Sequence, residues 1–231
     1  MSVELYFIAG WQEPLAATGL GTFEEMIHGE PGRCVSRHTR GQTYRVESAG
    51  IGVVYLKRDM HTSLKDMLID LLYLNKPQPP CLVELRAIRR VAALGIAAPE
   101  VVAWGQRRRW GLPWQGVLVT RELAGRPLSR MLLNDPPDEK RLEAVRGAGV
   151  VVGRLHAARL CWPDLAPKHF YIRRDGSIGV LDLARLRRDA GPRAAYVPKQ
   201  VRRFCQQLAR HGGTKAEAAA FRDGARQGMG R

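Results

Sequence analysis

Residues 160–185 read LCWPDLAPKHFYIRRDGSIGVLDLAR, and the rest of the chain is best interpreted from this stretch. Phe170–Ile172 and Ile178–Leu181 are short runs of β-prone residues, and residues 173–176 between them contain the Asp-Gly signal of a hairpin turn. A hairpin here places Asp164, just before the first strand, beside Asp182, at the end of the second. The stretch therefore predicts two carboxylates at one end of a hairpin.

Two carboxylates in this order are typical of a kinase catalytic loop followed by its metal-binding aspartate. In that arrangement one carboxylate orients the acceptor hydroxyl, and the other holds the metal ion on the nucleotide phosphates. Asp164 and Asp182 are the candidates for these two roles.

The bulk composition permits a folded core and indicates an anionic partner. The chain has 231 residues, 45% of them hydrophobic, which suits one domain or two small lobes, and it shows no internal repeat. Its formal charge of +15 fits a nucleic acid, a phosphorylated glycolipid, a membrane surface or a nucleotide. Charge alone does not choose among these partners.

The cysteines and the apolar runs indicate a cytoplasmic protein. The four cysteines are far apart and form no C-x-x-C pair, so neither a zinc site nor a disulfide scaffold is expected. Residues 1–10 carry an acidic Glu4 and no basic segment, which argues against an export signal. No run approaches membrane-spanning length, so the chain is expected to be soluble or peripherally attached to the inner membrane.

The first half predicts a small β-rich lobe. Three antiparallel strands are expected between Gly32 and Asp59, and Lys57 closes the last of them. Two more strands are expected in residues 98–105 and 116–123, joined by a basic and aromatic loop, residues 106–114. That loop is either an ordinary solvated hairpin tip or a surface for anionic headgroups.

Two helices are predicted between these strands. The first has Leu64, Met67, Leu68, Leu71 and Leu72 on one face, which favours packing onto a neighbouring element over docking to a membrane. The second runs from about residue 82 to residue 94 and carries Glu84 on its apolar face. Burying a carboxylate on such a face costs free energy unless it is paired, and a kinase fold supplies Lys57 as the partner. The alternative is that Glu84 lies in water at the edge of the apolar face.

The second half predicts a helical lobe after a linker near residues 122–125. Asp138 can cap a helix that runs to about residue 160, in which His156 is expected to be a structural core histidine. Another helix is expected around residues 198–211, and the small, charged tail from Gly212 is expected to be loosely ordered. The predicted domains are residues 1–123 and 124–231, in an α+β class.

The sequence resembles the bacterial lipopolysaccharide core kinases, the Kdo and heptose kinase family, over roughly residues 33–188. Each matching piece is weak alone, but the ordered set is specific. The pieces are Arg40-Gly41-Gln42-Thr43-Tyr44, Val54-Tyr55-Leu56-Lys57-Arg58, Glu84-Leu85-Arg86-Ala87-Ile88 with residues 94–99, Val119-Thr120-Arg121-Glu122-Leu123, Leu155-His156, Asp164 with His169, and Leu181-Asp182-Leu183-Ala184-Arg185.

This resemblance implies a two-lobed protein-kinase-like fold with a reduced helical C-terminal lobe. It also implies transfer of the γ-phosphoryl group of ATP to a sugar hydroxyl, heptose or Kdo, of the lipopolysaccharide inner core. By matching position, Lys57 grips the α/β-phosphates and pairs with Glu84, Asp164 is the base, and Asp182 binds Mg²⁺. His169 stands where protein kinases have a second metal-binding asparagine. Because magnesium prefers oxygen, His169 is expected to hold the loop or touch phosphate.

Gly41 and Glu122 complete the expected nucleotide-binding residues. Gly41 would let the backbone of a turn approach the phosphates, and Glu122 lies in the linker. The chain departs from protein kinases at Trp162-Pro163, which replaces His-Arg, and at Leu183-Ala184, which replaces Phe-Gly. The missing arginine argues against switching by activation-loop phosphorylation. Only 49 residues follow Asp182, without an Ala-Pro-Glu motif, which favours a non-protein acceptor.

Three alternatives remain open at the sequence level. They are another small-molecule or protein kinase of the same fold, a non-catalytic pseudokinase scaffold, and a basic nucleic-acid-binding protein. No specific nucleic acid is expected as a partner, because no recognised nucleic-acid-binding motif is present. The expected partner is an acidic glycolipid substrate, with peripheral contact to an anionic membrane.

Overall fold

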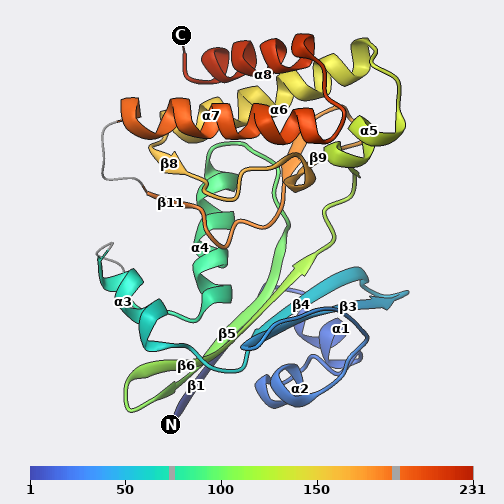
Figure 1. The fold of residues 1–231 in the computed structure, drawn as a ribbon. Helices are drawn as coiled ribbons and strands as arrows, with labels where there is room; N and C mark the ends of the chain where they lie inside the picture. Colours follow the sequence, from blue (N-terminus) through green and yellow to red (C-terminus); the bar gives the residue numbers. More distant parts are fainter. Residues whose placement is uncertain (73–75, 189–192, 231) are drawn as a thin grey trace. The chain divides into compact units, whose positions relative to one another are not determined.

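A computed structural model describes residues 1–72, 76–188 and 193–230 of the chain (Figure 1). The chain divides into two compact units, one formed by Met1–Arg86 with Pro99–Glu122 and the other by Ala87–Ala98 with Leu123–Arg231. The sequence placed a single boundary after residue 123. The structure differs in grouping Ala87–Ala98, the second half of a helix and the turn after it, with the second unit.

The first unit is built on a six-stranded antiparallel sheet in the order β1-β5-β6-β4-β3-β2. Its elements are β1 (Ser2–Phe7), α1 (Gln12–Ala16), α2 (Phe23–His28), β2 (Arg33–Arg37), β3 (Gly41–Ser48), β4 (Gly52–Asp59), α3 (Leu64–Leu72), the start of α4 (Pro80–Ala93), β5 (Val101–Arg109) and β6 (Leu112–Arg121). The sequence predicted five of the six strands. It missed β1, which pairs along β5 from Ser2 opposite Arg108 to Phe7 opposite Ala103.

The core of the first unit lies between the sheet and the two N-terminal helices, α1 and α2. Buried side chains of both helices pack against alternate residues of the strands: Leu15, Leu20, Phe23, Met26, Ile27, Tyr44, Val46, Ile51, Val54, Leu56, Val102, Ala103, Val117 and Val119. Arg58 is also buried on this side, where its guanidinium donates to the carbonyls of Met26 and Gly29 at the end of α2. Because successive residues of a strand face opposite sides, this packing leaves Lys57 on the other face of the sheet.

Helix α3 does not pack as the sequence predicted. Four of its leucines are largely exposed: Leu64 at 73%, Leu68 at 60%, Leu71 at 55% and Leu72 at 79%. The expectation that this apolar face covers a neighbouring element is wrong for these side chains. The 3.6-residue pattern correctly predicted the helix, but a pattern of this kind does not say what lies opposite the stripe.

The basic and aromatic loop predicted at residues 106–114 is also wrong, because most of these residues lie in strands. β5 extends to Arg109 and β6 begins at Leu112, so the turn contains only Trp110 and Gly111. Both turn residues have positive φ, 52° and 76°. Positive φ at both positions is typical of the type I′ turn, whose twist matches that of the flanking strands and lets them continue to the tip.

The second unit combines helices with two small sheets. Its elements are the remainder of α4, β7 (Arg126–Pro127), α5 (Leu128–Asn134), α6 (Glu139–Ala157), β8 (Leu160–Cys161), the 3₁₀ turn η1 (Pro167–His169), β9 (Phe170–Ile172), β10 (Ile178–Val180), β11 (Arg187–Arg188), α7 (Arg193–Arg210) and α8 (Lys215–Gly228). β9 and β10 form the antiparallel hairpin that the sequence predicted, with β7 on the far side of β9. The Asp138 side chain caps α6, also as predicted.

Helices α6 and α8 approach each other through glycines. Gly149 and Gly153 on α6 face Gly224 and Gly228 on α8, each pair four residues apart in its own helix. A Cβ added at Gly149 would lie 2.3 Å from the Phe221 carbonyl oxygen, and one at Gly224 would lie 2.2 Å from that of Arg146. Such distances leave no room for a side chain, so the two backbones pack directly against each other.

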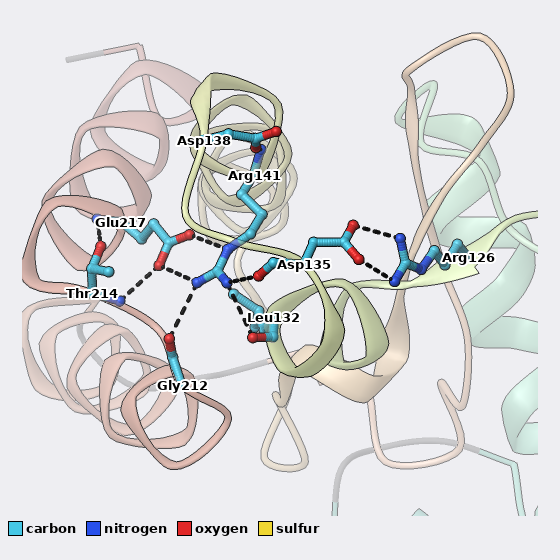
Figure 2. Close-up of polar contacts among 8 residues, drawn as sticks. All are labelled: Arg126, Leu132, Asp135, Asp138, Arg141, Gly212, Thr214 and Glu217. Atoms are coloured by element: carbon cyan, nitrogen blue, oxygen red, sulfur yellow. Dashed lines mark hydrogen bonds and ion pairs between the residues drawn. The ribbon is translucent and has the colours of Figure 1, made fainter.

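A buried ion pair joins the same two helices (Figure 2). Arg141 of α6 donates from Nε and Nη2 to the Glu217 carboxylate of α8, at 2.7 and 2.9 Å, and both residues are 2% exposed. Its remaining donors go to the carbonyls of Leu132 and Asp135 at the end of α5 and of Gly212 before α8. Arg141 thus joins the nearby end of α5 to two segments more than 70 residues further along the chain, Gly212 and α8.

The tail from residue 212 is helical, which corrects the expectation of a loosely ordered segment. Thr214 and Glu217 form a capping box, in which each side chain accepts a hydrogen bond from the other's backbone N–H. Phe221 of α8 stacks on Phe204 of α7 with ring centroids 3.9 Å apart. The sequence appeared unstructured because it is rich in small and charged residues, and those small residues are what allow the close helix contact.

We expect Glu217→Gln to lower the free energy of unfolding by about 3 kcal/mol or more, because it leaves the Arg141 charge buried without a compensating carboxylate. Urea unfolding of the purified variant would measure this loss. Asp223→Asn on the same helix removes an exposed partner of Arg226 and should change stability little. Equal losses in both variants would contradict the assigned role of the buried pair.

The same pair predicts a pH dependence of stability. Burial raises the pKa of Glu217, but the hydrogen bonds from Arg141 and Thr214 outweigh it, so the net pKa is lowered. A carboxylate with a lowered pKa in the folded state stabilises above its unfolded pKa, and this contribution is lost as the pH falls through the folded pKa. The stability difference between wild type and Glu217→Gln should therefore be constant near neutrality and shrink only in acid. A difference that already shrinks near pH 7 would contradict this assignment.

Candidate active site

Lys57 and Glu84 are brought together in the first unit, as the sequence predicted. Lys57 lies on β4, on the sheet face opposite α1 and α2, and its Nζ donates to Oε1 and Oε2 of Glu84 at 2.6 and 2.7 Å. The Glu84 side chain is 7% exposed and that of Lys57 is 31% exposed. The alternative that Glu84 lies in water is excluded. The pair leaves a partly open ammonium held in place by a buried carboxylate.

The second unit places Asp164 in the loop between β8 and η1. Its carboxylate accepts a hydrogen bond from Nη1 of Arg185 at 2.9 Å. Pro163 just before it accepts through its carbonyl from Nη1 of Arg203, on α7, at 2.7 Å. The carboxylate itself is partly exposed, with 32% of the side chain accessible. The loop is thus held by arginines while its carboxylate stays open to a ligand.

Trp162 gives a physical account of the departure from the usual His-Arg. It is 1% exposed, and its ring lies 5.9 Å from that of His169 and 5.6 Å from that of Phe170. A side chain of this size anchors the loop in the core by packing, where a protein kinase has a polar histidine. The backbone on either side of Asp164 is therefore fixed by apolar burial.

Asp182 follows β10 and has an unusual backbone conformation. Its φ is 62°, in the left-handed region, which costs most side chains energy but is tolerated by Asp and Asn. The Leu181 N–H just before it donates to the His169 carbonyl at 2.9 Å, which ties the end of the hairpin to η1. The Asp182 side chain is 50% exposed. The strained backbone turns this carboxylate toward solvent.

His169 faces Asp182. Its Nδ1 lies 3.7 Å from Oδ2 of Asp182, and its side chain is 8% exposed. The ring is buried against Trp162 and presents a nitrogen to the carboxylate. His169 in this place suits an orienting role toward Asp182. The carboxylate of Asp182, and not the imidazole of His169, is then the group available to a magnesium ion.

Gly41 and Glu122 belong to the first unit, with different surroundings. Gly41 starts β3 after a turn closed by hydrogen bonds to His38, and a Cβ there would come within 3.0 Å of the Arg58 carbonyl oxygen. It is a glycine required by close strand packing. Glu122 follows β6, where its N–H donates to the Val53 carbonyl and its side chain accepts from the Tyr55 hydroxyl at 3.1 Å.

The donor set around Asp182 fits magnesium bound mainly by a substrate. Mg²⁺ is commonly held by one or two carboxylates together with phosphate oxygens and water, and it requires exposed oxygens. Asp182 supplies one half-exposed carboxylate. Within the described ranges no group of three or more His, Cys, Asp or Glu side chains gathers as a metal site.

A family model covers most of the chain, including these residues. The model of the lipopolysaccharide kinase (Kdo/WaaP) family matches residues 26–224. The chain belongs to this family. Membership in this lipopolysaccharide kinase family supports a phosphotransferase activity, and it confirms the resemblance drawn from the motifs.

One solved structure supports the fold of this lipopolysaccharide kinase family member. The structure of WaaP in complex with acyl carrier protein is similar over 97% of this chain and 89% of that chain, with a TM-score of 0.71 and 19% identity. A structure of WbdD with a kinase inhibitor has a TM-score of 0.46 at 16% identity and covers 82% of this chain and 44% of that one. No curated protein matches significantly. The predicted kinase-like α+β fold is confirmed.

Sequence reasoning missed two contributors to the site of this lipopolysaccharide kinase. Arg185 was noted as the last residue of the motif Leu181-Asp182-Leu183-Ala184-Arg185 but was given no role in the site, although it pairs with Asp164. Its position as the third residue after Asp182 was an available signal, because a tight turn after a strand can bring such a residue back to the preceding loop. Arg203 was missed because its partner is a backbone carbonyl, which leaves no sequence signal.

We expect Asp182→Asn and Asp182→Ala to differ in stability. Asn tolerates left-handed φ, whereas Ala in this conformation costs roughly 1 kcal/mol. Thermal unfolding should therefore show Asp182→Asn close to wild type and Asp182→Ala less stable. The reverse order would show that the conformation of residue 182 does not limit the choice of side chain, and the result selects the variant to use in activity assays.

Proposed function

We propose that this chain is an ATP-dependent kinase that phosphorylates a heptose or Kdo hydroxyl of the lipopolysaccharide inner core. The observation that best supports this is the bidentate pairing of Lys57 with the buried Glu84. A buried carboxylate that holds a strand lysine in this way is the arrangement kinases use to position the nucleotide phosphates. It lies within the residues matched by the family model.

Each site residue then has a distinct role. Lys57 would neutralise the α/β-phosphates of ATP while Glu84 keeps its ammonium in place. Asp164 would accept the proton of the sugar hydroxyl, or orient that hydroxyl, and Arg185 would hold the Asp164 carboxylate in position. In this chemistry, positioning and charge neutralisation supply most of the rate enhancement. The Trp162-Pro163 departure is therefore compatible with activity.

Asp182 would hold magnesium, and His169 would orient Asp182. A magnesium ion held there would supply neutralisation of the negative charge on the nucleotide phosphates. This orienting role rests on proximity and not on a hydrogen bond, since His169 Nδ1 lies 3.7 Å from Asp182 Oδ2. Gly41 and Glu122 would contact the nucleotide through their backbones, since the Glu122 side chain is already bonded to Tyr55.

Charge and family membership support the proposed location and acceptor. The formal charge of +15 favours an acidic glycolipid in an anionic bilayer, and the family acts on lipopolysaccharide. We place the reaction at the cytoplasmic face of the inner membrane. Among the described residues, no helix is both long enough and apolar enough to cross a bilayer. Because the similar WaaP structure is a complex with acyl carrier protein, such a carrier is a candidate partner to include in assays.

The test is incubation with labelled ATP and Mg²⁺ and a panel of extracted core glycolipids, with and without an acyl carrier protein, followed by identification of the phosphorylated sugar. We expect Asp164→Asn and Asp182→Asn to lower transfer by a factor on the order of 10³ or more, because each removes a charge needed at the reacting groups. Lys57→Ala should mainly weaken nucleotide use.

The matched control is Asp223→Asn, which removes an exposed carboxylate on α8 that accepts a hydrogen bond from Nη1 of Arg226. It should leave transfer unchanged. Turnover like that of wild type in either Asp164→Asn or Asp182→Asn would overturn the assignment of that residue. Absence of transfer to every glycolipid, together with tight and salt-sensitive DNA binding, would favour a non-catalytic scaffold.

A further inference from the structure

The first unit presents an apolar helix face to solvent. Leu64, Leu68, Leu71 and Leu72 of α3 are 55–79% exposed and recur at helical spacing on one side. A single exposed leucine needs no explanation, but four on one face make a contiguous apolar surface that requires a partner.

The tip of the β5–β6 hairpin is a second exposed apolar feature of the first unit, besides the leucine face of α3. Trp110 is 85% exposed and occupies the first position of the two-residue turn, with φ of 52°. Left-handed φ is unfavourable for a bulky side chain, and Asn or Asp is preferred at this position of a type I′ turn. The chain therefore keeps a tryptophan in water at a position where it costs stability, which points to a use outside the folded core.

Basic residues accompany this tryptophan. The Arg109 guanidinium lies over the Trp110 ring at 4.4 Å from its centroid and over Trp114 at 5.8 Å. Arg108, the residue before it, donates to the Gly111 carbonyl and so stays at the tip. Tryptophan prefers the interface between water and hydrocarbon, and arginine binds phosphate, so together they match the headgroup layer of an anionic bilayer.

The hairpin tip and the start of α3 are linked. Thr62, two residues before α3, donates from its N–H to the Trp114 carbonyl at 2.7 Å and from its hydroxyl at 3.2 Å. His61 packs beside Trp114, with ring centroids 6.4 Å apart. The Arg109 guanidinium, which lies over the Trp110 ring, also lies over the Trp114 ring. The leucine face and the tryptophan tip are therefore parts of one connected region of the first unit.

We propose that α3 and the β5–β6 tip form a docking surface for an anionic phospholipid bilayer. The four leucines would enter the boundary between headgroups and acyl chains, and Trp110 would sit at the interface with Arg108 and Arg109 on lipid phosphates. Only the purpose of this surface depends on the proposed function: it would keep the enzyme at the membrane where a glycolipid acceptor lies. Charge complementarity favours the bilayer over an apolar protein face, because the apolar patch adjoins exposed arginine and the chain is strongly basic.

The test is co-sedimentation of the full chain with vesicles of pure phosphatidylcholine, or of phosphatidylcholine mixed with an about equal part of phosphatidylglycerol. No nucleotide is present, so the outcome does not depend on kinase activity. Wild type should bind the anionic vesicles, with binding weakened by salt, and should bind the neutral vesicles far less. Its tryptophan fluorescence should shift to the blue on binding.

Substitutions distinguish binding through this surface from non-specific binding to vesicles. Leu68→Gln with Leu71→Gln should lower vesicle partitioning about tenfold or more, because each buried leucine contributes to insertion. Trp110→Asn should also lower it about tenfold, while Tm stays equal or rises, because Asn-Gly suits the turn. Leu133→Gln removes a leucine that is 64% exposed on α5 of the other unit, and it should bind like wild type.

Three results would overturn the proposal. The first is wild-type protein that binds neither vesicle, or both equally. The second is a double leucine variant that binds anionic vesicles as well as wild type does. The third is a concentration-dependent dimer in sedimentation that the leucine changes abolish without altering vesicle binding, since that would assign the face to a second copy of this chain.

Discussion

Burial of the Arg141 guanidinium constrains the whole second unit. A buried charge is tolerated only when its hydrogen bonds are completed, and here the partners come from the end of α5, the loop before α8 and α8 itself. Glu217 serves twice, because its carboxylate pairs with Arg141 and also caps α8 through the Thr214 N–H. The interaction therefore fixes where α8 begins as well as where it lies against α6.

From α8 the constraint passes to the candidate site through aromatic packing. Phe221 stacks on Phe204 of α7, and Phe204 meets the edge of Phe170, which packs against Trp162 in the loop that carries Asp164. Arg203 on α7 adds a hydrogen bond to that loop. An apolar ladder thus performs the positioning for which protein kinases use His-Arg, and it explains why a bulky Trp162 is compatible with an ordered carboxylate.

Sequence predicted the parts of the site that depend on local pattern. Strand alternation, an acid on an apolar helix face and an Asp-Gly turn are local signals, so Lys57, Glu84 and the hairpin bearing Asp182 were found. The partners of Asp164 are set by tertiary placement, so the spacing of Arg185 after Asp182 was a signal that did not by itself identify Asp164 as its partner. α8 was missed because glycines that permit helix contact look like those of a loose tail. The exposure of α3 could not be foreseen, since an amphipathic pattern is the same whether the stripe meets protein, lipid or water.

The distance in sequence between Arg141 and Glu217 has a consequence for biosynthesis. The two residues are separated by 76 positions, so helix α6 emerges from the ribosome long before the carboxylate that neutralises its arginine. Until α8 follows, the glycine face of α6 lacks its native cover and the arginine lacks its carboxylate, and the nascent second unit resembles an exposed intermediate of the kind that chaperones bind. Truncations or slow codons before residue 217 would lengthen that interval, and the yield of folded protein would fall even though every candidate site residue had already been made.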